Sequence, residues 1–387
     1  MSNNLRTGRY VTQPEGYSAF IPAPFPPDPP VRMDNKLSRL LSRADQALGR
    51  LDGVTWYLPN PDLFVGMYVR QEAVLSAQIE GTQSTLEDLL AYEQTGGRRK
   101  QRKDVEEIVN YVKAMNHGLD RLADFPLSLR LIKEIHGLLL QDVRGGHKQP
   151  GEFRASQNWI GAGGLTNLPE AAYVPAPVHE MKRALDDLEK FLHDDRSYPP
   201  LVRSGLAHAQ FETIHPFLDG NGRMGRLLIT FLLCRRGILS KPLLYLSHYL
   251  KAHRDEYYDR LTAIRNDDDW EGWIEFFLEG VRQVSDEAVR KAQAILGLRE
   301  KHRDLIAGSA TRSPNVIGLL DWLFEQPRFD IPAAARHLGC AYPTASNAVG
   351  KLEELGIVEE MTGQNRNRVY RYGPYIDLFK DAVGEPL

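Results

Sequence analysis

The sequence predicts a mainly α-helical protein that carries one short β-hairpin and ends in a smaller, separate domain. Three observations support this fold class. Most of the chain between residues 35 and 306 has apolar side chains at helical spacing. Residues Gln157 to Pro175 instead hold two short apolar or aromatic pieces around a tip of Gly, Asn and Pro residues, which is typical of a hairpin. After about residue 310, three helical patterns precede a two-stranded pattern.

Length and composition indicate a folded protein of two or three domains. The chain has 387 residues, of which 42% are hydrophobic and 26% are charged. Its formal charge of -3 gives no global attraction to nucleic acid or to an anionic membrane. The two cysteines form no Cys-x-x-Cys pattern, and the longest apolar run, Leu227 to Cys234, is too short to span a bilayer. We therefore expect a cytoplasmic location and no membrane partner.

The N-terminal segment from Tyr17 to Val31 is rich in proline and must be extended. It could be a free tail that recruits partners. An arm along the surface of the domain is favoured, because Tyr17, Phe20 and Phe25 offer side chains to bury.

Helical patterns fill the next part of the chain, from Asn35 to about Glu93. Within it, one helix is expected to end at Gly81, and its shared apolar face is formed by Phe64, Tyr68, Leu75 and Ile79. The basic segment from Gly96 to Lys103 has no interleaved aromatic residues, so a solvated connector is favoured over a nucleic-acid contact.

Amphipathic patterns also predict most of the middle of the chain to be helical. The predicted helices are Val105–Leu122, Ser128–Leu140, Glu180–Asp194, Pro200–Thr213, Gly225–Gly237 and Arg254–Gly280. A densely charged connecting helix, Val281–Ile306, follows them.

The C-terminal part has the element order of a winged helix-turn-helix domain. The three predicted helices are Asn315–Phe324, Ile331–Leu338 and Pro343–Leu355, and two short strands around residues 357–361 and 368–372 follow them.

The most informative stretch is a loop of twelve residues, His215-Pro-Phe-Leu-Asp-Gly-Asn-Gly-Arg-Met-Gly-Arg226. Pro216 prevents simple continuation of the preceding helix, and two glycines within three positions lead into the next one near Met224. A glycine-containing turn that opens a helix presents backbone N–H groups and the positive end of the helix dipole, which together bind phosphate.

The charged residues of this loop fit the same interpretation. Arg223 and Arg226 lie three residues apart near the start of a helix, where cations need an anion to justify their position. Asp219 is a hard oxygen ligand suited to Mg²⁺, and His215 can accept a hydroxyl proton. Each residue alone has an ordinary structural explanation, but their combination favours a functional site.

This loop resembles the signature of the Fic-domain family, HPFxDGNGRxxR, at every fixed position. The resemblance implies a helical Fic core that transfers AMP from ATP to a Ser, Thr or Tyr hydroxyl of a protein, itself included, and releases pyrophosphate. It implies that His215 is the catalytic base and that Asp219 holds Mg²⁺. It further implies a nucleotide-binding set formed by Gly220, Asn221, Gly222, Arg223, Met224, Gly225 and Arg226.

Two other segments resemble parts of the same family. Gly151-Glu-Phe-Arg154, followed by Trp159, Ile160 and Gly161, is similar to the flap hairpin that docks the target as an added strand; an ordinary surface hairpin remains the alternative. Downstream, Tyr257 lies in a region that resembles the adenosine pocket. A buried core position for this tyrosine is equally compatible with the sequence.

The stretch from Ser76 to Gly81 resembles the inhibitory motif (S/T)xxxE(G/N) that some Fic proteins carry in the same chain. Ser76 and Glu80 share a helix face, so Glu80 could pair with Arg226 and block the γ-phosphate. An exposed glutamate at a helix end is the alternative. In some relatives the same glutamate supports removal of AMP, so a de-AMPylating enzyme also remains possible on sequence grounds.

The predicted domains are the N-terminal arm and inhibitory-helix region (1–103), the Fic core (104–280), the connecting helix (281–309) and the winged helix domain (310–387). A second function, a DNA-binding regulator whose Fic core senses nucleotide, rests on Thr344, Ser346, Asn347 and Lys351 and on Arg366 and Arg368 of the wing. Nearby glutamates weaken that case. Fic proteins often pair, so a homodimer is compatible with the resemblance, but the sequence indicates no interface.

Overall fold

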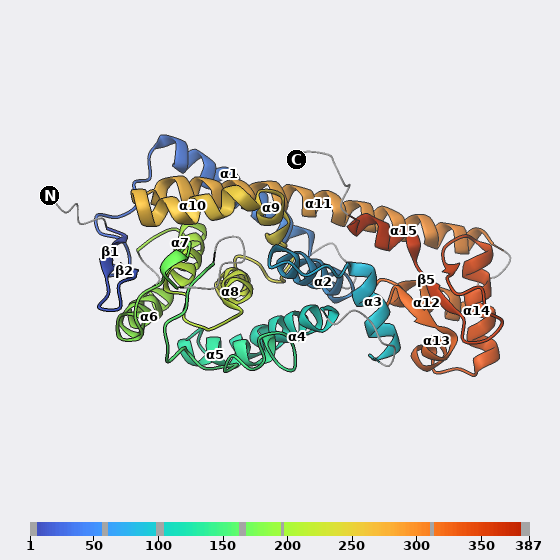
Figure 1. Cartoon of the computed structure of the whole chain (residues 1–387). Helices are drawn as coiled ribbons and strands as arrows, with labels where there is room; N and C mark the ends of the chain where they lie inside the picture. The colour runs from blue at the N-terminus through green and yellow to red at the C-terminus, as the bar shows by residue number, and fades with distance from the viewer. Residues whose placement is uncertain are drawn as a thin grey trace.

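The computed structural model describes residues 6–55, 61–97, 104–161, 168–194, 197–309 and 313–380. It is mainly helical, as predicted. Figure 1 shows a long helix, α11, that runs along one side of the molecule and joins a large helical body to a smaller C-terminal group of elements. Helix α8 lies near the middle of the large body.

The N-terminal arm lies on the helical body, which confirms the favoured interpretation. Its strands β1 (Gly8–Thr12) and β2 (Ser18–Pro22) pair antiparallel, and the Phe20 amide donates to the Val174 carbonyl at 2.9 Å. The buried Phe25 ring lies 4.5 Å from that of Phe191 and 6.1 Å from that of Trp270. Proline content predicted an extended chain but not the hairpin, because its partner strand precedes the proline-rich segment.

Three helices follow the arm: α1 (Asn35–Val54), α2 (Pro61–Ile79) and α3 (Leu86–Thr95). Helix α1 packs along α11. Helix α2 ends just before Gly81, which has a φ of +94°, so the predicted helix end is confirmed. Of the basic segment, residues 98–103 lie outside the described residues.

The middle of the chain folds largely as predicted. Its helices are α4 (Val105–Leu122), α5 (Leu129–Leu139), α6 (Val178–His193), α7 (Pro200–Ile214), α8 (Asn221–Arg235) and α9 (Ser247–Ala252). The predicted start of α8 near Met224 was wrong, because the helix already begins at Asn221. Gly220 makes this possible: as N-cap it has a φ of +77°, which lets the chain turn directly into the helix.

The predicted single helix from Arg254 to Gly280 was also wrong. The chain forms α10 (Arg254–Asp267) and α11 (Trp270–Gly308) instead. Asp268 between them has a φ of +60°, and the Asp269 carboxylate accepts a hydrogen bond from the Gly272 amide at 2.9 Å, as an N-cap does. The connecting helix predicted from residue 281 is therefore continuous with the last helix of the body.

The C-terminal elements are α12 (Pro314–Trp322), β3 (Arg328–Asp330), α13 (Ile331–Leu338), α14 (Tyr342–Glu354), β4 (Glu359–Glu360), β5 (Val369–Arg371) and α15 (Gly373–Ile376). The strands form one antiparallel sheet in the order β3-β5-β4. All three helices and both strands match the predicted order. Strand β3 was not predicted, and the winged helix-turn-helix assignment stays a prediction.

Helix α2 contacts the C-terminal elements through aromatic rings near its start. The Phe64 ring lies 5.4 Å from that of Phe324, and the Tyr68 ring lies 5.4 Å from that of Phe379. Strand β5 adds an ion pair from Arg371 to Glu87 at 3.6 Å. The C-terminal elements thus pack directly on α2 and α3.

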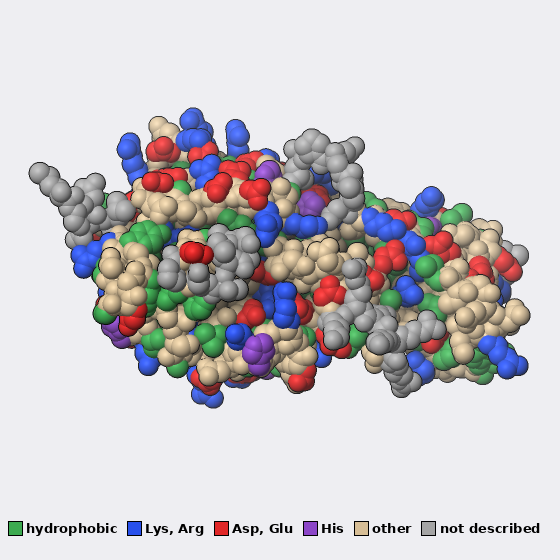
Figure 2. All heavy atoms as spheres, in the orientation of Figure 1, with side chains coloured by type: hydrophobic (Ala, Val, Ile, Leu, Met, Phe, Trp, Pro, Cys, Tyr) green, Lys and Arg blue, Asp and Glu red, His purple; other side chains and the backbone are tan. Residues whose placement is uncertain are grey.

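The visible surface carries both signs of charge. In Figure 2, acidic and basic side chains are interspersed, and most of the atoms over α13 and α14 belong to neither kind. Among the described residues, none of the helices combines the length and apolar character needed to cross a bilayer.

Candidate active site

The predicted loop joins α7 to α8 and turns sharply at both ends. His215 ends α7 in the left-handed conformation, with a φ of +50°, and Gly220 precedes α8 in the same region. No side chain caps the start of α8. The amides of its first turn therefore face the loop, as expected for an anion-binding helix start.

Asn221 closes the loop through its side chain. Its carbonyl oxygen accepts from the Phe217 amide at 2.9 Å, and its Nδ2 donates to the Phe217 carbonyl at 2.8 Å. Both ends of the side chain thus serve the loop, and the backbone N–H of Asn221 lies in the first turn of α8. Gly222 follows it, and a Cβ at that position would collide with the Glu80 carboxylate.

Asp219 and Arg223 lie next to each other in the loop. Asp219 accepts from the Gly220 amide at 2.6 Å, and one of its oxygens lies 3.6 Å from Nη2 of Arg223. The buried Arg223 guanidinium also contacts Glu107 on α4 at 3.3 Å. Sequence analysis missed Glu107, since it is far from the loop in the chain and its helical pattern gives no sign of this contact.

His215 lies in a position that favours the neutral imidazole. Burial and, next in size, the neighbouring Arg154 lower its pKa to about 4, while the backbone of Glu212 and the Glu80 carboxylate act in the opposite direction. Its Nδ1 is buried without a well-formed hydrogen bond. A neutral histidine can accept a proton, which is what the predicted role requires.

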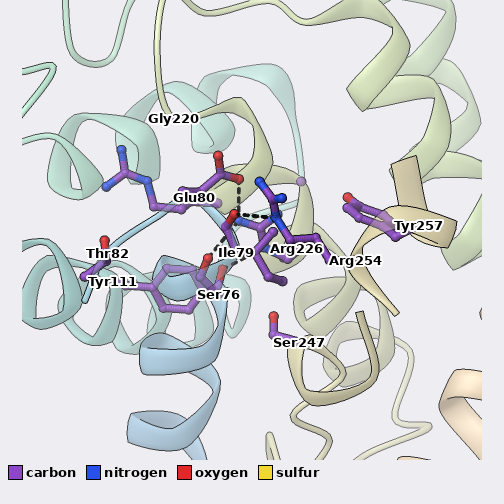
Figure 3. Close-up of polar contacts among 12 residues, drawn as sticks. Ser76, Ile79, Glu80, Thr82, Tyr111, Gly220, Arg226, Ser247, Arg254 and Tyr257 are labelled. Carbon is purple, nitrogen blue, oxygen red and sulfur yellow. Dashed lines mark hydrogen bonds and ion pairs between the residues drawn. The ribbon is translucent and has the colours of Figure 1, made fainter. Parts of the chain in front are cut away.

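Arg226 is held by the end of α2, as Figure 3 shows. Its Nε donates to the Ser76 hydroxyl at 2.8 Å, its Nη2 donates to the Ser76 carbonyl at 3.1 Å, and the same Nη2 lies 2.7 Å from Oε1 of Glu80. Burial opposes ionisation of Glu80, but Arg226 outweighs it and the pKa of this carboxyl is lowered. The structure thus brings together all three residues of the predicted inhibitory contact.

Glu72 is a buried carboxyl that lies one turn before Ser76 on α2, and it was not predicted. It accepts hydrogen bonds from the Ser247 amide at 3.0 Å, the Ser247 hydroxyl at 2.5 Å and the Tyr111 hydroxyl at 3.2 Å. Burial raises its pKa to about 7, although Ser247 and Arg226 favour the charged form. Glu72 thereby ties α2 to α4 and α9.

Glu72→Gln is expected to stabilise the protein more at pH 8 than at pH 5. The pKa of Glu72 is raised from an ordinary 4.5, so its contribution to stability is complete below about pH 4.5 and is lost as pH rises through 7. Glutamine stays neutral throughout. The difference in Tm between variant and parent should grow by at least about 2 °C from pH 5 to pH 8. The exposed Glu300→Gln is the control, and an equal difference at both pH values would contradict this assignment.

The remaining predicted nucleotide contacts lie deeper in the fold. Met224 is fully buried, and the Gly225 carbonyl accepts from Nδ1 of His208 at 2.9 Å. Nε2 of His208 in turn accepts from the Tyr257 hydroxyl at 2.9 Å. Tyr257 is buried in this network, and its neighbour Tyr258 is the exposed ring of the pair. Direct contact of Tyr257 with a nucleotide stays a prediction.

The predicted hairpin lies beside the loop. Ile160 pairs with Tyr173 in a single antiparallel bridge, and the tip at residues 162–167 lies outside the described residues. Trp159 and Ile160 are 38% and 41% exposed, and Gly161 is exposed as well. Large apolar side chains that face solvent beside a candidate site are available to a partner.

The fold and this loop define a mainly α-helical protein built around a helix-opening loop, with a flanking hairpin and a helix that covers the loop. Family comparison makes the class specific. Residues 38–120 match the Fic/DOC family N-terminal domain, and residues 126–233 match the Fic/DOC family domain. Residues 38–233 of this chain thus contain both domains of the Fic/DOC family.

Curated relatives carry an enzyme name. The protein adenylyltransferase Fic of Aedes aegypti is 31% identical over 180 residues, and that of Culex quinquefasciatus is 30% identical over 180 residues. The match covers 45% of this chain in both cases, and 32% and 31% of the relatives. The chain therefore matches about a third of the length of these two proteins.

Solved structures share the fold. A Fic family protein from Desulfovibrio desulfuricans aligns over 89% of this chain and 97% of its own, with a TM-score of 0.57 and 22% identity. A Fic domain containing signaling protein from Bacteroides thetaiotaomicron aligns over 67% of this chain and 97% of its own, with a TM-score of 0.50 and 19% identity. At 89% coverage, the first likeness extends beyond residues 38–233.

Proposed function

We propose that this chain is a protein adenylyltransferase that transfers AMP from ATP to a Ser, Thr or Tyr hydroxyl of a target protein, and of itself. The observation that carries the proposal is the convergence of a neutral His215, the uncapped start of α8 and the buried Arg226 around one loop. The names of the Aedes and Culex relatives support it.

The phosphates of ATP would bind at the start of α8. The backbone amides of Asn221 and Gly222 lie in its first turn, and Arg223 and Arg226 supply positive charge from the same helix. Asp219 would hold Mg²⁺ against the phosphates. Its carboxylate is partly exposed, and one carboxylate together with substrate phosphates and water is the donor set that Mg²⁺ commonly takes. Bound there, the ion would neutralise phosphate charge.

The chemistry of transfer requires a base at the incoming hydroxyl. His215 would accept that proton while the hydroxyl oxygen bonds to the α-phosphorus of ATP, and the bond from this phosphorus to the bridging oxygen breaks to release pyrophosphate. The protein contributes mainly position and charge, because the phosphoryl centre itself reacts without a covalent enzyme intermediate in this scheme.

Glu80 would inhibit this reaction in the state described here. Its Oε1 accepts a hydrogen bond from Nη2 of Arg226. The carboxylate also lies against Gly222, where a phosphate would approach. A negative phosphate would also be repelled by the ionised carboxylate. ATP must therefore displace Glu80 to bind in the reactive position.

Target docking would take place at the hairpin. A peptide added as a strand beside Ile160 could bury Trp159 and Ile160 and bring a hydroxyl toward His215. A cytoplasmic location, homodimerisation and DNA binding remain predictions; both cysteines are unpaired, which suits a reducing compartment.

Labelled ATP tests this function directly. We expect the Glu80→Gly protein to retain label from ATP labelled at the α-phosphate and none from ATP labelled at the γ-phosphate. Retention of γ-label instead would identify a phosphotransferase, and retention of neither, with intact ATP binding, would contradict the proposal. The reverse reaction is tested by removing ATP from the labelled protein and then adding unlabelled protein. If labelled AMP is then released, the chain catalyses removal of AMP.

A further inference from the structure

Arg154 is buried directly beneath the catalytic loop, at the start of the hairpin segment, and is 1% exposed. Its Nε donates to the His215 carbonyl at 3.1 Å, its Nη1 to the Ser156 carbonyl at 3.3 Å and its Nη2 to the Ala176 carbonyl at 2.5 Å. Its backbone amide donates to the Pro216 carbonyl at 2.9 Å. One residue thus binds two consecutive carbonyls of the loop.

The guanidinium is an unusual group for this position. In the part of the chain that the structure describes, Arg154 forms no ion pair with a carboxylate. Burial lowers its pKa to about 10, while Tyr173 and Tyr17 act in the opposite direction. A buried cation without a counter-ion is costly, and neutral donors could serve carbonyls alone. This cost points to a use for the positive charge.

The backbone at His215 needs support. A non-glycine residue with a φ of +50° is in a conformation that costs roughly 1–2 kcal/mol. Its carbonyl accepts from Arg154 and also from Nδ2 of Asn158, at 3.2 Å. Asn158 additionally donates to the Phe217 carbonyl at 2.8 Å. Two side chains of the hairpin segment therefore determine where the loop backbone lies.

We propose that Arg154 is a positioning residue for the base: it fixes the backbone of His215, links that backbone to the target-docking hairpin, and places a positive charge next to this residue. The inference rests on the proposed function of the loop. It assigns to Arg154 no contact with ATP or target.

Charged groups face His215 from several elements. Besides burial, Arg154 on the hairpin segment and Arg265 on α10 disfavour its protonation. Glu80 at the end of α2 and the backbone of Glu212 on α7 favour it. Arg154 is the largest of the charged influences, so removing its charge while Glu80 and Arg265 stay in place should raise the pKa of His215 from about 4 toward 6.5.

A titration of His215 by NMR tests the charge without any need for activity. The full chain is compared with Arg154→Gln, which removes the charge, and Arg154→Lys, which keeps it. The matched control is Arg203→Gln: Arg203 is another buried arginine, which donates to the carbonyls of Phe191 and Leu192 and lies at the start of α7, the opposite end of that helix from His215. We expect a raised midpoint in Arg154→Gln alone.

AMP transfer, measured in the Glu80→Gly background, tests the position. Lysine cannot reproduce the fork of three hydrogen bonds, so Arg154→Lys should lower the rate of transfer by about tenfold or more. Arg154→Gln should also transfer AMP more slowly. On the acid side of its pH profile, its rate of transfer should begin to fall at a higher pH than the rate of the Glu80→Gly parent. Arg203→Gln should keep the rate and pH profile of its parent.

An unchanged His215 midpoint in folded Arg154→Gln would overturn the electrostatic part, and full transfer by Arg154→Lys would overturn the positioning part. If Arg154→Gln does not fold, the proposal is tested by the transfer rate and the His215 titration of Arg154→Lys. Transfer by Arg154→Lys at the rate of the Glu80→Gly parent would then contradict the proposal. If the Glu80→Gly parent transfers no AMP, the proposed function fails, while the titration still decides whether Arg154 acts on His215.

Discussion

Glu80→Gly is expected to raise AMP incorporation by about ten- to hundredfold at subsaturating ATP. The substitution removes a charge-assisted hydrogen bond to Arg226 at 2.7 Å and a carboxylate that lies over Gly222. Such bonds contribute about 1.5–3 kcal/mol, and each 1.4 kcal/mol corresponds to a factor of ten. The measurement is the ATP concentration that gives half-maximal incorporation of α-labelled AMP.

Two controls separate charge from backbone effects in this experiment. Glu80→Gln keeps the size of the side chain, so it should raise AMP incorporation less than Glu80→Gly does. Glu93 pairs with Arg70 at 2.9 Å in a comparable half-buried ion pair, so Glu93→Gln should leave transfer unchanged. Equal incorporation by Glu80→Gly and the parent would remove the inhibitory role of Glu80.

His215→Ala in the Glu80→Gly background is expected to lower AMP transfer by about 10²- to 10⁴-fold, the usual contribution of a general base. ATP binding should persist, because the proposed phosphate contacts lie at the start of α8 and on its arginines. Burial lowers the pKa of His215 to about 4, so the base is already neutral above about pH 5 and transfer should fall only as pH approaches 4.

The control for this variant is His179→Ala, an exposed histidine on α6. Transfer by His215→Ala at the parental rate would exclude this histidine as the base. Loss of ATP binding together with transfer would instead indicate that His215 supports the loop rather than the chemistry.

The sequence was sufficient to predict the site residues that lie close together in the chain. Local rules specify a glycine turn before a helix and the shared helix face of Ser76 and Glu80, so the loop and the candidate inhibitory motif could both be located. The pairing of Glu80 with Arg226 was expected only from the family resemblance, and other contacts between distant residues carried no such signal. Glu107 meets Arg223 from 116 residues away, and the partners of Glu72 lie on two other helices.

Errors in the fold prediction have the same physical origin. The break between α10 and α11 depends on Asp268 and Asp269, whose acidic cluster also fits a helix surface. The early start of α8 depends on the bond between Asn221 and Phe217, which only the closed loop reveals. Periodicity describes which face of a helix is buried, but it does not fix where tertiary contacts end the helix.

Helix α2 places two distant parts of the protein on one stiff rod. Near its start, Phe64 and Tyr68 contact rings of the C-terminal elements, and just beyond its last residue Glu80 holds Arg226. Its 19 residues span about 28 Å, over which a helix transmits displacement rather than absorbing it. A displacement of the C-terminal elements along this helix would therefore change the contact between Glu80 and Arg226.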